Sequence, residues 1–151
     1  MLKFAVEKLA DVRNECGELI AAHWSEIAVW QDIPLDPDWT AYENLEKIGM
    51  LVIYTVRTEA GQLVGYAVFI TRKHIHYKAH SWAANDIIWV HPDYRDGKVG
   101  RNLAQFWEQD LKDRGIHVVH VNVKVDHPAL GFVLRREKYR PVESGFEKRL
   151  N

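Results

Sequence analysis

The sequence predicts a mixed α/β fold in one domain over residues 1–151, and three observations support this. A chain of 151 residues suits one compact domain. Its 47% hydrophobic and 27% charged residues are enough to build a core and a charged surface. Alternating and helical apolar patterns follow one another in the order β-α-α-β-β-β-α-β-α-β, which predicts helices packed on a sheet.

The first third predicts one strand and two helices. Residues 2–7 alternate between apolar and polar types, as in a short strand. Between residues 11 and 30, apolar side chains recur at spacings of three and four, which predicts a helix with one buried stripe. Asp36-Pro37 is typical of a helix start, with Asp as the cap and Pro in the first turn, and Gly49 is expected to end this second helix.

The middle of the chain predicts three strands. Residues 51–58 and 63–71 are rich in β-branched types and flank a turn, so they are expected to form a hairpin. Residues 72–81 are polar, basic and rich in histidine, which indicates a loop or a frayed hairpin end. A further strand is expected over residues 82–90, stopped by His91-Pro92.

The last third predicts two helices and two strands. A helix is expected over residues 100–114, closed by Gly115, and a strand over residues 116–125. Asp126-His127-Pro128 is expected to begin the last helix. Residues 140–150 alternate loosely, which predicts a final strand.

Composition excludes several classes of protein. The net charge of −1 provides no global field for nucleic acid or an acidic membrane. Cys16, the one cysteine, lies on a predicted apolar stripe and is expected in the core, with neither a disulfide framework nor a cysteine zinc cluster. Early charges argue against a signal peptide, and no apolar run suits a membrane span, so a cytoplasmic location is expected.

Residues 90–103 combine a strand end, a polar loop and a helix start, which indicates an anion site. The first amides of a helix lack intrahelical partners, and the helix dipole favours negative charge there. Gly97 and Gly100 allow a phosphate to approach the backbone. Three cations add positive charge: Arg95, Lys98 and Arg101. A pyrophosphate fits this pattern; a plain capped surface loop is the alternative, and the Gly-Lys-Ser/Thr order of a P-loop is absent.

The pattern Val-x-Pro-x-Tyr-Arg followed by a glycine loop and a helix resembles the pyrophosphate loop of the GNAT superfamily of acyl-CoA-dependent N-acyltransferases. The element order resembles that fold over nearly the whole chain. Where the family has Arg/Gln-x-x-Gly-x-Gly/Ala, this chain has Arg95, Lys98 and Gly100, with Gly97 one place early. The resemblance implies a mostly antiparallel sheet with splayed fourth and fifth strands, acetyl-CoA as co-substrate, and direct attack by a primary amine.

The resemblance also implies which residues bind acetyl-CoA. They are the backbone of the fourth strand, the loop and one residue of the last helix: Ile88, Trp89, Val90, Arg95, Asp96, Gly97, Lys98, Val99, Gly100, Arg101 and Leu134. In the last helix, Leu134 stands where the family often has the tyrosine that protonates the leaving thiolate. Lys138-Tyr139 stands at the family's Gly-Phe. Short patterns such as Asp36-Pro-Asp-Trp and Asn85-Asp-Ile resemble a phage- or prophage-encoded branch.

Asp86 is the candidate general base. A lysine-like amine has a pKa of about 10.4, so it must lose a proton before it attacks. Strand alternation places Asp86 on the same face as Ile88 and Val90, near the glutamate position common in the family. The alternative is that Asp86 caps or pairs with a neighbouring group.

The first two helices form one wall of the acceptor site in the fold that the resemblance implies. Acidic and aromatic side chains gather in this part of the sequence and would suit a cationic amine. The predicted acceptor contacts are Trp24, Glu26, His74, Tyr77 and Asn122. A solvated acidic face with buried aromatic residues is the alternative.

His74, His76 and His80 form a cluster without a carboxylate or cysteine at ligand spacing, so we expect no metal site. A solvated hairpin tip or a substrate loop fits them better.

Two other functions stay open. Leu134 favours a non-catalytic module that binds acyl-CoA, whereas Asp86 and the loop favour an enzyme. A nucleic-acid-associated protein would use the basic residues near the predicted hairpin end: Arg72, Lys73, His74, His76 and Lys78. The acceptor is left open among a small molecule, a peptide and a modified base, without a membrane partner. The oligomeric state is left open between a monomer and a homodimer.

Overall fold

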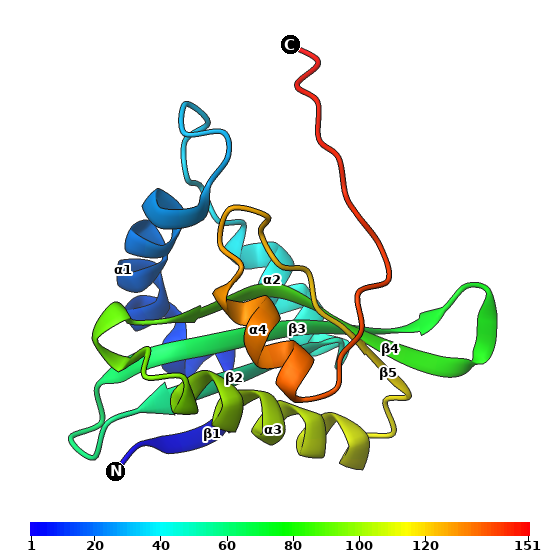
Figure 1. Cartoon of the computed structure of the whole chain (residues 1–151), viewed down its shortest axis with the longest axis horizontal. Helices are drawn as coiled ribbons and strands as arrows, with labels where there is room; N and C mark the ends of the chain where they lie inside the picture. Colours follow the sequence, from blue (N-terminus) through cyan, green and yellow to red (C-terminus); the bar gives the residue numbers. More distant parts are fainter.

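A computed structural model describes residues 1–151 and contains one five-stranded sheet in the order β1-β2-β3-β4-β5 (Figure 1). The first four strands are antiparallel neighbours, and β5 runs parallel to β4. The strands are β1 (Lys3–Glu7), β2 (Leu51–Arg57), β3 (Leu63–His74), β4 (Tyr77–Val90) and β5 (Val118–His120). The predicted mixed fold class and the order of elements up to the last helix are confirmed.

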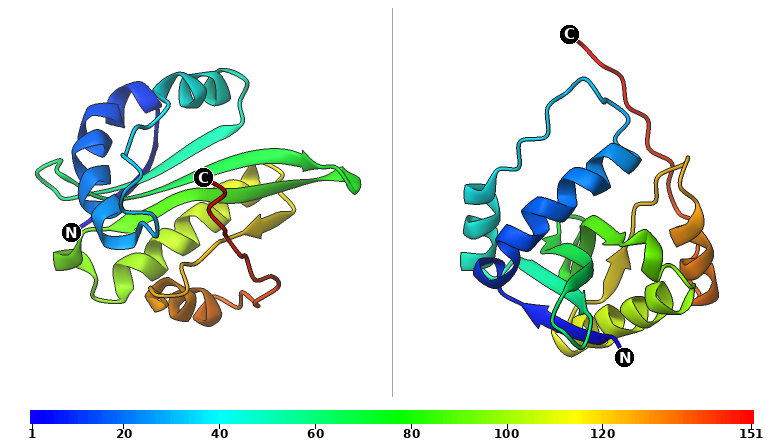
Figure 2. Two further views of the ribbon diagram at one scale, coloured as in Figure 1. Left: turned by 90° about the horizontal axis from the view of Figure 1, so that it is seen from above. Right: turned by 90° about the vertical axis from the view of Figure 1, so that its left-hand side faces the viewer.

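Helices cover both faces of the sheet (Figure 2). On one face lie α1 (Leu9–Ile27) and α2 (Trp39–Lys47), and on the other lie α3 (Lys98–Asp113) and α4 (Ala129–Arg136). Because helices cover both faces of the sheet, the central strands β2 and β3 are buried on both sides, and their sequences are nearly continuous apolar runs.

Each face has its own core. Leu103, Trp107 and Leu111 of α3 recur every fourth residue and pack against Tyr54 and Phe69 of the sheet. On the opposite face, the stripe of α1 packs against Tyr66 and Trp89. Cys16 belongs to this second core, as predicted, and burial raises the pKa of its thiol to about 11. The thiol therefore stays protonated and is a poor nucleophile.

Two helix starts differ from the sequence prediction. The cap of α2 is Asp38, whose Oδ1 accepts from the amide of Ala41 at 2.9 Å, and not Asp36. The helix α3 begins at Lys98, two residues early, because Gly97 takes a left-handed φ of 79° and turns the chain directly into the helix. Lys98, Val99 and Gly100 therefore form the first turn of α3.

The segment 72–81 is not a loop. Both strands continue into it, so that only Ile75 and His76 separate β3 from β4, and the hairpin projects beyond the rest of the sheet (Figure 1). Aromatic contacts support this extension. Between ring centroids, Trp82 lies 4.4 Å from His74 on the neighbouring strand, and it stacks at 5.5 Å on Tyr77 of its own strand.

The predicted final strand over residues 140–150 does not form. Pro141 lacks an amide donor, and β5 offers a template of only three residues. The tail instead leaves the sheet and crosses to the loop after α1, where Trp30 Nε1 donates to Glu147 Oε2 at 3.1 Å and Arg149 pairs with Asp32. Side-chain contacts with a distant loop thus replace a β-ladder.

None of the helices has the length and apolar character needed to cross a lipid bilayer.

Candidate active site

The strands β4 and β5 separate after a short stretch of pairing. Trp82–Ala84 pair with Val118–His120, and no backbone hydrogen bond joins residues 85–90 to residues 121–125. The side chain of Asn85 spans the point of separation: its Oδ1 accepts from the Asn122 amide at 2.7 Å and its Nδ2 donates to the Asn122 carbonyl at 3.4 Å. The expected splay of the fourth and fifth strands is confirmed, and the edge of β4 beyond Asn85 has no partner strand.

A β-bulge lies in β4 at the same level. Val68 pairs with Ile87, whereas the next residue, Phe69, pairs with Asn85, so Asp86 is the extra residue. A bulge leaves its extra residue outside the ladder and changes which face the following side chains occupy.

The bulge overturns the predicted face of Asp86. Ile88 and Val90 pack on the α3 side of the sheet, whereas Ile87 packs on the α1 side. Asp86 also faces this second side, since the hydroxyl of Tyr42 in α2 donates a hydrogen bond to its Oδ2. Strand alternation failed here because it assumes an unbroken period of two.

Asp86 is exposed, and Tyr42 is its one hydrogen-bond partner. Burial of the phenol, reinforced by the bond to Asp86, raises the pKa of Tyr42. Tyr42 therefore stays a donor at neutral pH and holds the carboxylate in place. The alternative prediction, that Asp86 pairs with a basic side chain, is not what the structure contains.

The predicted anion loop forms the start of α3, and part of its binding capacity is already used. Asp96 Oδ1 accepts from the amides of Lys98 and Val99 at 2.9 and 3.1 Å, and these bonds lower the pKa of Asp96. A phosphate at these two amides has to displace the carboxylate. Asp96 is fully exposed, so its side chain is free to rotate away.

Beside this loop, a cavity of about 320 Å³ opens between α3 and α4. Its lining residues are Gly97, Arg101, Ala129, Phe132, Val133 and Arg136. Arg101 pairs with Glu137 at 2.6 Å, whereas the guanidinium of Arg136 makes no hydrogen bond or ion pair. The sequence singled out Arg101 and Gly97 but not Arg136 or Phe132, which only the docking of α4 brings to the loop.

Leu134 does not line this cavity. Its side chain is 4% exposed and packs in the core with α3, while its neighbour Val133 faces the cavity and lies 3.6 Å from a Cβ built on Gly100. The match of Lys138 to the family's glycine agrees with the structure, because Lys138 takes the left-handed φ of 67° that favours glycine. Leu134 is therefore a core residue, and its contact with acetyl-CoA stays a prediction.

Arg95 and Glu26, predicted for two different binding sites, bind each other. Arg95 Nη1 and Nη2 donate to the two carboxylate oxygens of Glu26 at 2.6 and 2.8 Å, and its Nε donates to the Val90 carbonyl at 2.7 Å. Trp89 Nε1 also donates to Glu26, at 3.2 Å. The bonds from Arg95 lower the pKa of Glu26 to about 2. The pair joins α1 to the end of β4, and the predicted ligand contacts of both side chains stay predictions.

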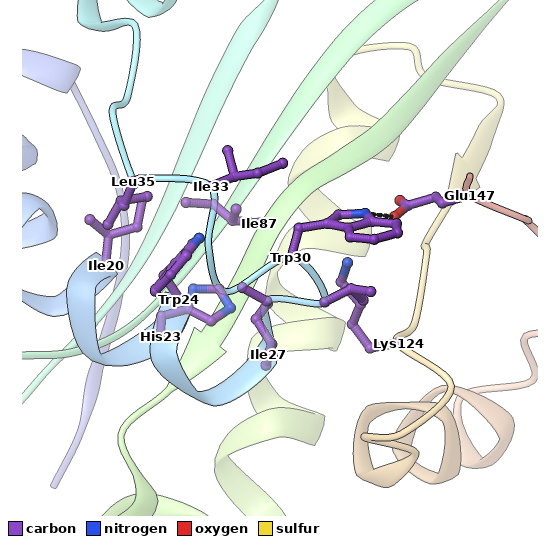
Figure 3. A pocket seen from close by; sticks show the side chains of 12 residues that line it. Ile20, His23, Trp24, Ile27, Trp30, Ile33, Leu35, Ile87, Lys124 and Glu147 are labelled. Atoms are coloured by element: carbon purple, nitrogen blue, oxygen red, sulfur yellow. Dashed lines mark hydrogen bonds between the residues drawn. The ribbon is translucent and has the colours of Figure 1, made fainter. Parts of the chain in front are cut away.

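A second cavity, also of about 320 Å³, lies on the α1 side of the sheet (Figure 3). Its walls are the end of α1, the loop 28–38, β4, the segment after β5, and the tail. Nine of its 12 lining residues are hydrophobic. The full lining is Ile20, His23, Trp24, Ile27, Ala28, Val29, Trp30, Ile33, Leu35, Ile87, Lys124 and Glu147.

The predicted acceptor residues divide between this cavity and other places. Trp24 lines it, as the sequence suggested, and Asn122 lies at the separation of β4 and β5, where His120 Nε2 is 3.2 Å from its Oδ1. His74 and Tyr77 lie at the tip of the projecting hairpin, at the opposite end of the sheet from α1 (Figures 1 and 2). They do not contact the cavity.

Six acidic residues lie between residues 26 and 46, in the part of the chain predicted to form the acceptor wall. Five of them are bound to other parts of the protein, and Asp36 is the exception. These pairs are Glu26 with Arg95, Asp32 with Arg149, Asp38 with the Ala41 amide, Glu43 with Arg13, and Glu46 with the Leu9 amide.

His23 is a site residue whose environment the sequence did not reveal. It is 2% exposed, its Nδ1 lies 2.9 Å from the Tyr66 hydroxyl, and its ring stacks on Trp89. Burial lowers the pKa of His23 to about 4, so the ring is neutral at pH 7.

The separated strands, the loop at the start of α3 and the flanking cavities are features of an acyltransferase fold. The model of the Acetyltransferase (GNAT) family matches residues 8–136. Because this match covers most of the chain, the protein belongs to that family, whose members are acyltransferases that use acetyl-CoA. No curated protein matches the sequence.

Solved structures share the fold at low sequence identity. A ribosomal-protein-alanine N-acetyltransferase from Brucella melitensis is 18% identical, with a TM-score of 0.75 and 100% of both chains covered. An aminoglycoside acetyltransferase from an uncultured soil metagenomic sample, in complex with sisomicin, is 18% identical, with a TM-score of 0.76 over 99% of this chain and 97% of the other. A predicted acetyltransferase from Clostridium acetobutylicum with acetyl-CoA is 13% identical, with a TM-score of 0.72 over 99% of this chain and 97% of the other.

Proposed function

We propose that this protein is an N-acetyltransferase that transfers the acetyl group of acetyl-CoA to a primary amine. The separation of β4 from β5 at Asn85 is the observation that carries the proposal. It leaves the backbone of Ile88, Trp89 and Val90, which pairs with β3 on one side, without a partner strand on the β5 side, beside the start of α3. Backbone groups at such an edge can bind the amides of a pantetheine arm as an added strand would.

The cavity between α3 and α4 suits the diphosphate end of acetyl-CoA. Its free cation, Arg136, and its partly neutralised cation, Arg101, supply positive charge, and the amides of the first turn of α3 supply donors. Asp96 would leave these amides when the phosphates arrive. The exposed Phe132 would cover part of the bound molecule.

The chemistry proposed is a direct transfer. The amine nitrogen forms a bond to the thioester carbonyl carbon, the carbon–sulfur bond breaks, and coenzyme A leaves as a thiolate. We assign to Asp86 the acceptance of the amine proton, directly or through a water molecule. The bulge turns Asp86 towards the α1 side of the sheet, and the neighbouring Ile87 lines the apolar cavity. With Leu134 buried, the thiolate is protonated by solvent in this proposal.

The first test is acetyl-CoA binding, followed by release of free thiol across a panel of amines. Native mass spectrometry should detect one bound acetyl-CoA. Gly100→Glu should weaken binding at least tenfold, because its carboxylate meets the phosphates at the helix start. Gly100→Ala is the matched control, since a Cβ there makes an ordinary 3.6 Å contact with Val133. Equal affinities for the Glu and Ala variants would place acetyl-CoA elsewhere.

The second test concerns the base. Asp86→Asn keeps the shape of the side chain and an acceptor for Tyr42. It should lower kcat by about 10²–10⁴-fold while the Kd for acetyl-CoA stays unchanged. A kcat equal to that of the wild type would make Asp86 a positioning or structural residue.

A second candidate function is nucleic-acid association. Residues 71–85 of the projecting hairpin contain three cations, Arg72, Lys73 and Lys78, and no acidic side chain. Exposed Tyr77 beside Trp82 adds a surface on which a base could stack. Binding to DNA or RNA that weakens steeply with salt, and that is lost on neutralising the three cations, would support it. A cytoplasmic location and membership of a phage-encoded branch remain parts of the proposal.

A further inference from the structure

The apolar cavity of Figure 3 contains a charge pattern that indicates its ligand. One cationic side chain, Lys124, and one carboxylate, Glu147, stand at its rim among nine hydrophobic residues. Lys124 forms no ion pair. Glu147 accepts from Trp30 Nε1 through Oε2 at 3.1 Å, which leaves Oε1 free. A ligand that complements this cavity has one negative group, one positive group and an apolar body.

We propose that the acceptor is a free α-amino acid with a large apolar or aromatic side chain. This inference rests on the proposed function and specifies its substrate class. The carboxylate of the amino acid would bind Lys124, its ammonium group would be captured by Glu147, and its side chain would lie among Trp24, Trp30 and Ile87. A volume of about 320 Å³ is at the lower end of the range of about 300–1,000 Å³ for ligand sites, so the ligand is small.

The lining argues against a polycationic acceptor. Such a ligand needs several free carboxylates, and Glu147 is the one carboxylate among the 12 lining residues. Glu26 binds Arg95 with both oxygens, and it does not line the cavity. A polycation would also meet Lys124 with the wrong sign of charge.

The C-terminal tail completes the cavity from the far side. Glu147 lies beside Trp30 and accepts a hydrogen bond from its Nε1 (Figure 3). Arg149 pairs with Asp32 and so joins the tail to the loop after α1. The two contacts hold the one acidic lining residue in place, although it is distant in sequence from α1.

The cavity also borders the proposed chemistry. Ile87 lines it and follows Asp86 directly, and Lys124 belongs to the segment that departs from β4. An amino acid held here would present its amine towards the separated edge of β4. The amine would leave Glu147, and its nitrogen would form the amide bond to the acetyl carbon as the carbon–sulfur bond breaks. The amine proton would pass through water to Asp86, which does not itself line the cavity.

The test compares four ligands: L-phenylalanine, phenylalaninamide, phenethylamine and spermidine. Thiol release gives kcat/KM for each, and calorimetry gives binding of L-phenylalanine in the presence of coenzyme A. L-phenylalanine should be the best substrate of the four. Lys124→Met should lower its kcat/KM and its affinity about tenfold or more, while the amide and phenethylamine, which lack the carboxylate, change less than threefold.

Two further variants sharpen the comparison. Glu147→Gln keeps an acceptor for Trp30 and should weaken binding of all ligands that carry an ammonium group. Lys148→Met makes the same substitution as Lys124→Met, but at a tail residue that does not line the cavity, and it should leave every value unchanged.

The outcomes separate the substrate class from the function. Acetylation of spermidine without binding or acetylation of L-phenylalanine would overturn the amino-acid proposal and leave the N-acetyltransferase proposal standing. Equal losses for L-phenylalanine and phenethylamine in Lys124→Met would also overturn it. Binding of L-phenylalanine that depends on Lys124, without thiol release from any amine, would support the site and refute the acetyltransferase function.

Discussion

The buried imidazole of His23 makes a quantitative prediction about stability and pH. Burial lowers the pKa of His23 from 6.5 to about 4 in the folded protein. In the unfolded chain the ring is solvated and titrates near 6.5. Between these values the unfolded state binds a proton that the folded state does not, so acid favours unfolding. The stability linked to neutral His23 is fully present above pH 6.5 and is lost as the pH falls towards 4.

The magnitude follows from the two pKa values. One pKa unit corresponds to about 1.4 kcal/mol, so the free energy of unfolding linked to His23 falls by about 2 kcal/mol between pH 8 and pH 5 and by about 3 kcal/mol in total. With a urea m-value of about 2 kcal/mol/M, the midpoint should drop by about 1 M by pH 5 through this residue alone.

Urea titrations of wild type and His23→Gln at pH 8, 6.5 and 5 measure this effect. Gln does not titrate, and its amide can still bond to the Tyr66 hydroxyl. The variant should have a lower free energy of unfolding than wild type at pH 8. This difference should disappear or change sign by pH 5. Parallel pH profiles for the two proteins would refute the reasoning, because they would mean that the imidazole takes up its proton without unfolding.

Two further predictions concern the strand separation and the end of α4. Asn85→Ala removes two hydrogen bonds to Asn122 and should cost about 1–3 kcal/mol, or roughly 3–9 °C in Tm by calorimetry, with a higher KM for acetyl-CoA. Asn122→Ala retains both backbone partners and should leave Tm nearly unchanged, so an equal loss in both variants would contradict this role. Lys138→Gly should raise Tm by about 2 °C. A left-handed backbone costs about 1–2 kcal/mol for a residue with a side chain, and this gain exceeds the roughly 0.5–1 kcal/mol of chain entropy that glycine loses on folding. A lower Tm would mean that the Lys138 side chain stabilises the fold.

The sequence by itself determined the features that depend on local periodicity. The four-residue spacing of Leu103, Trp107 and Leu111 defined α3 and its buried face, because a helix returns to the same side about every fourth residue. The three- and four-residue spacing around Cys16 did the same for α1. The strand–loop–helix pattern around Gly97 also predicted the anion loop, since its geometry is made by neighbouring residues.

Only the tertiary structure decided which face and which partner each polar side chain has. One extra residue at the bulge moved Asp86 to the α1 side, and strand alternation cannot register such an insertion. Arg95 and Glu26 lie 69 positions apart, so their pairing has no local signature. The apolar cavity joins α1, β4, Lys124 and Glu147. These segments meet because a short β5 and a proline-containing tail release the end of the chain from the sheet, and an ion pair and a hydrogen bond then hold the tail against the distant loop after α1.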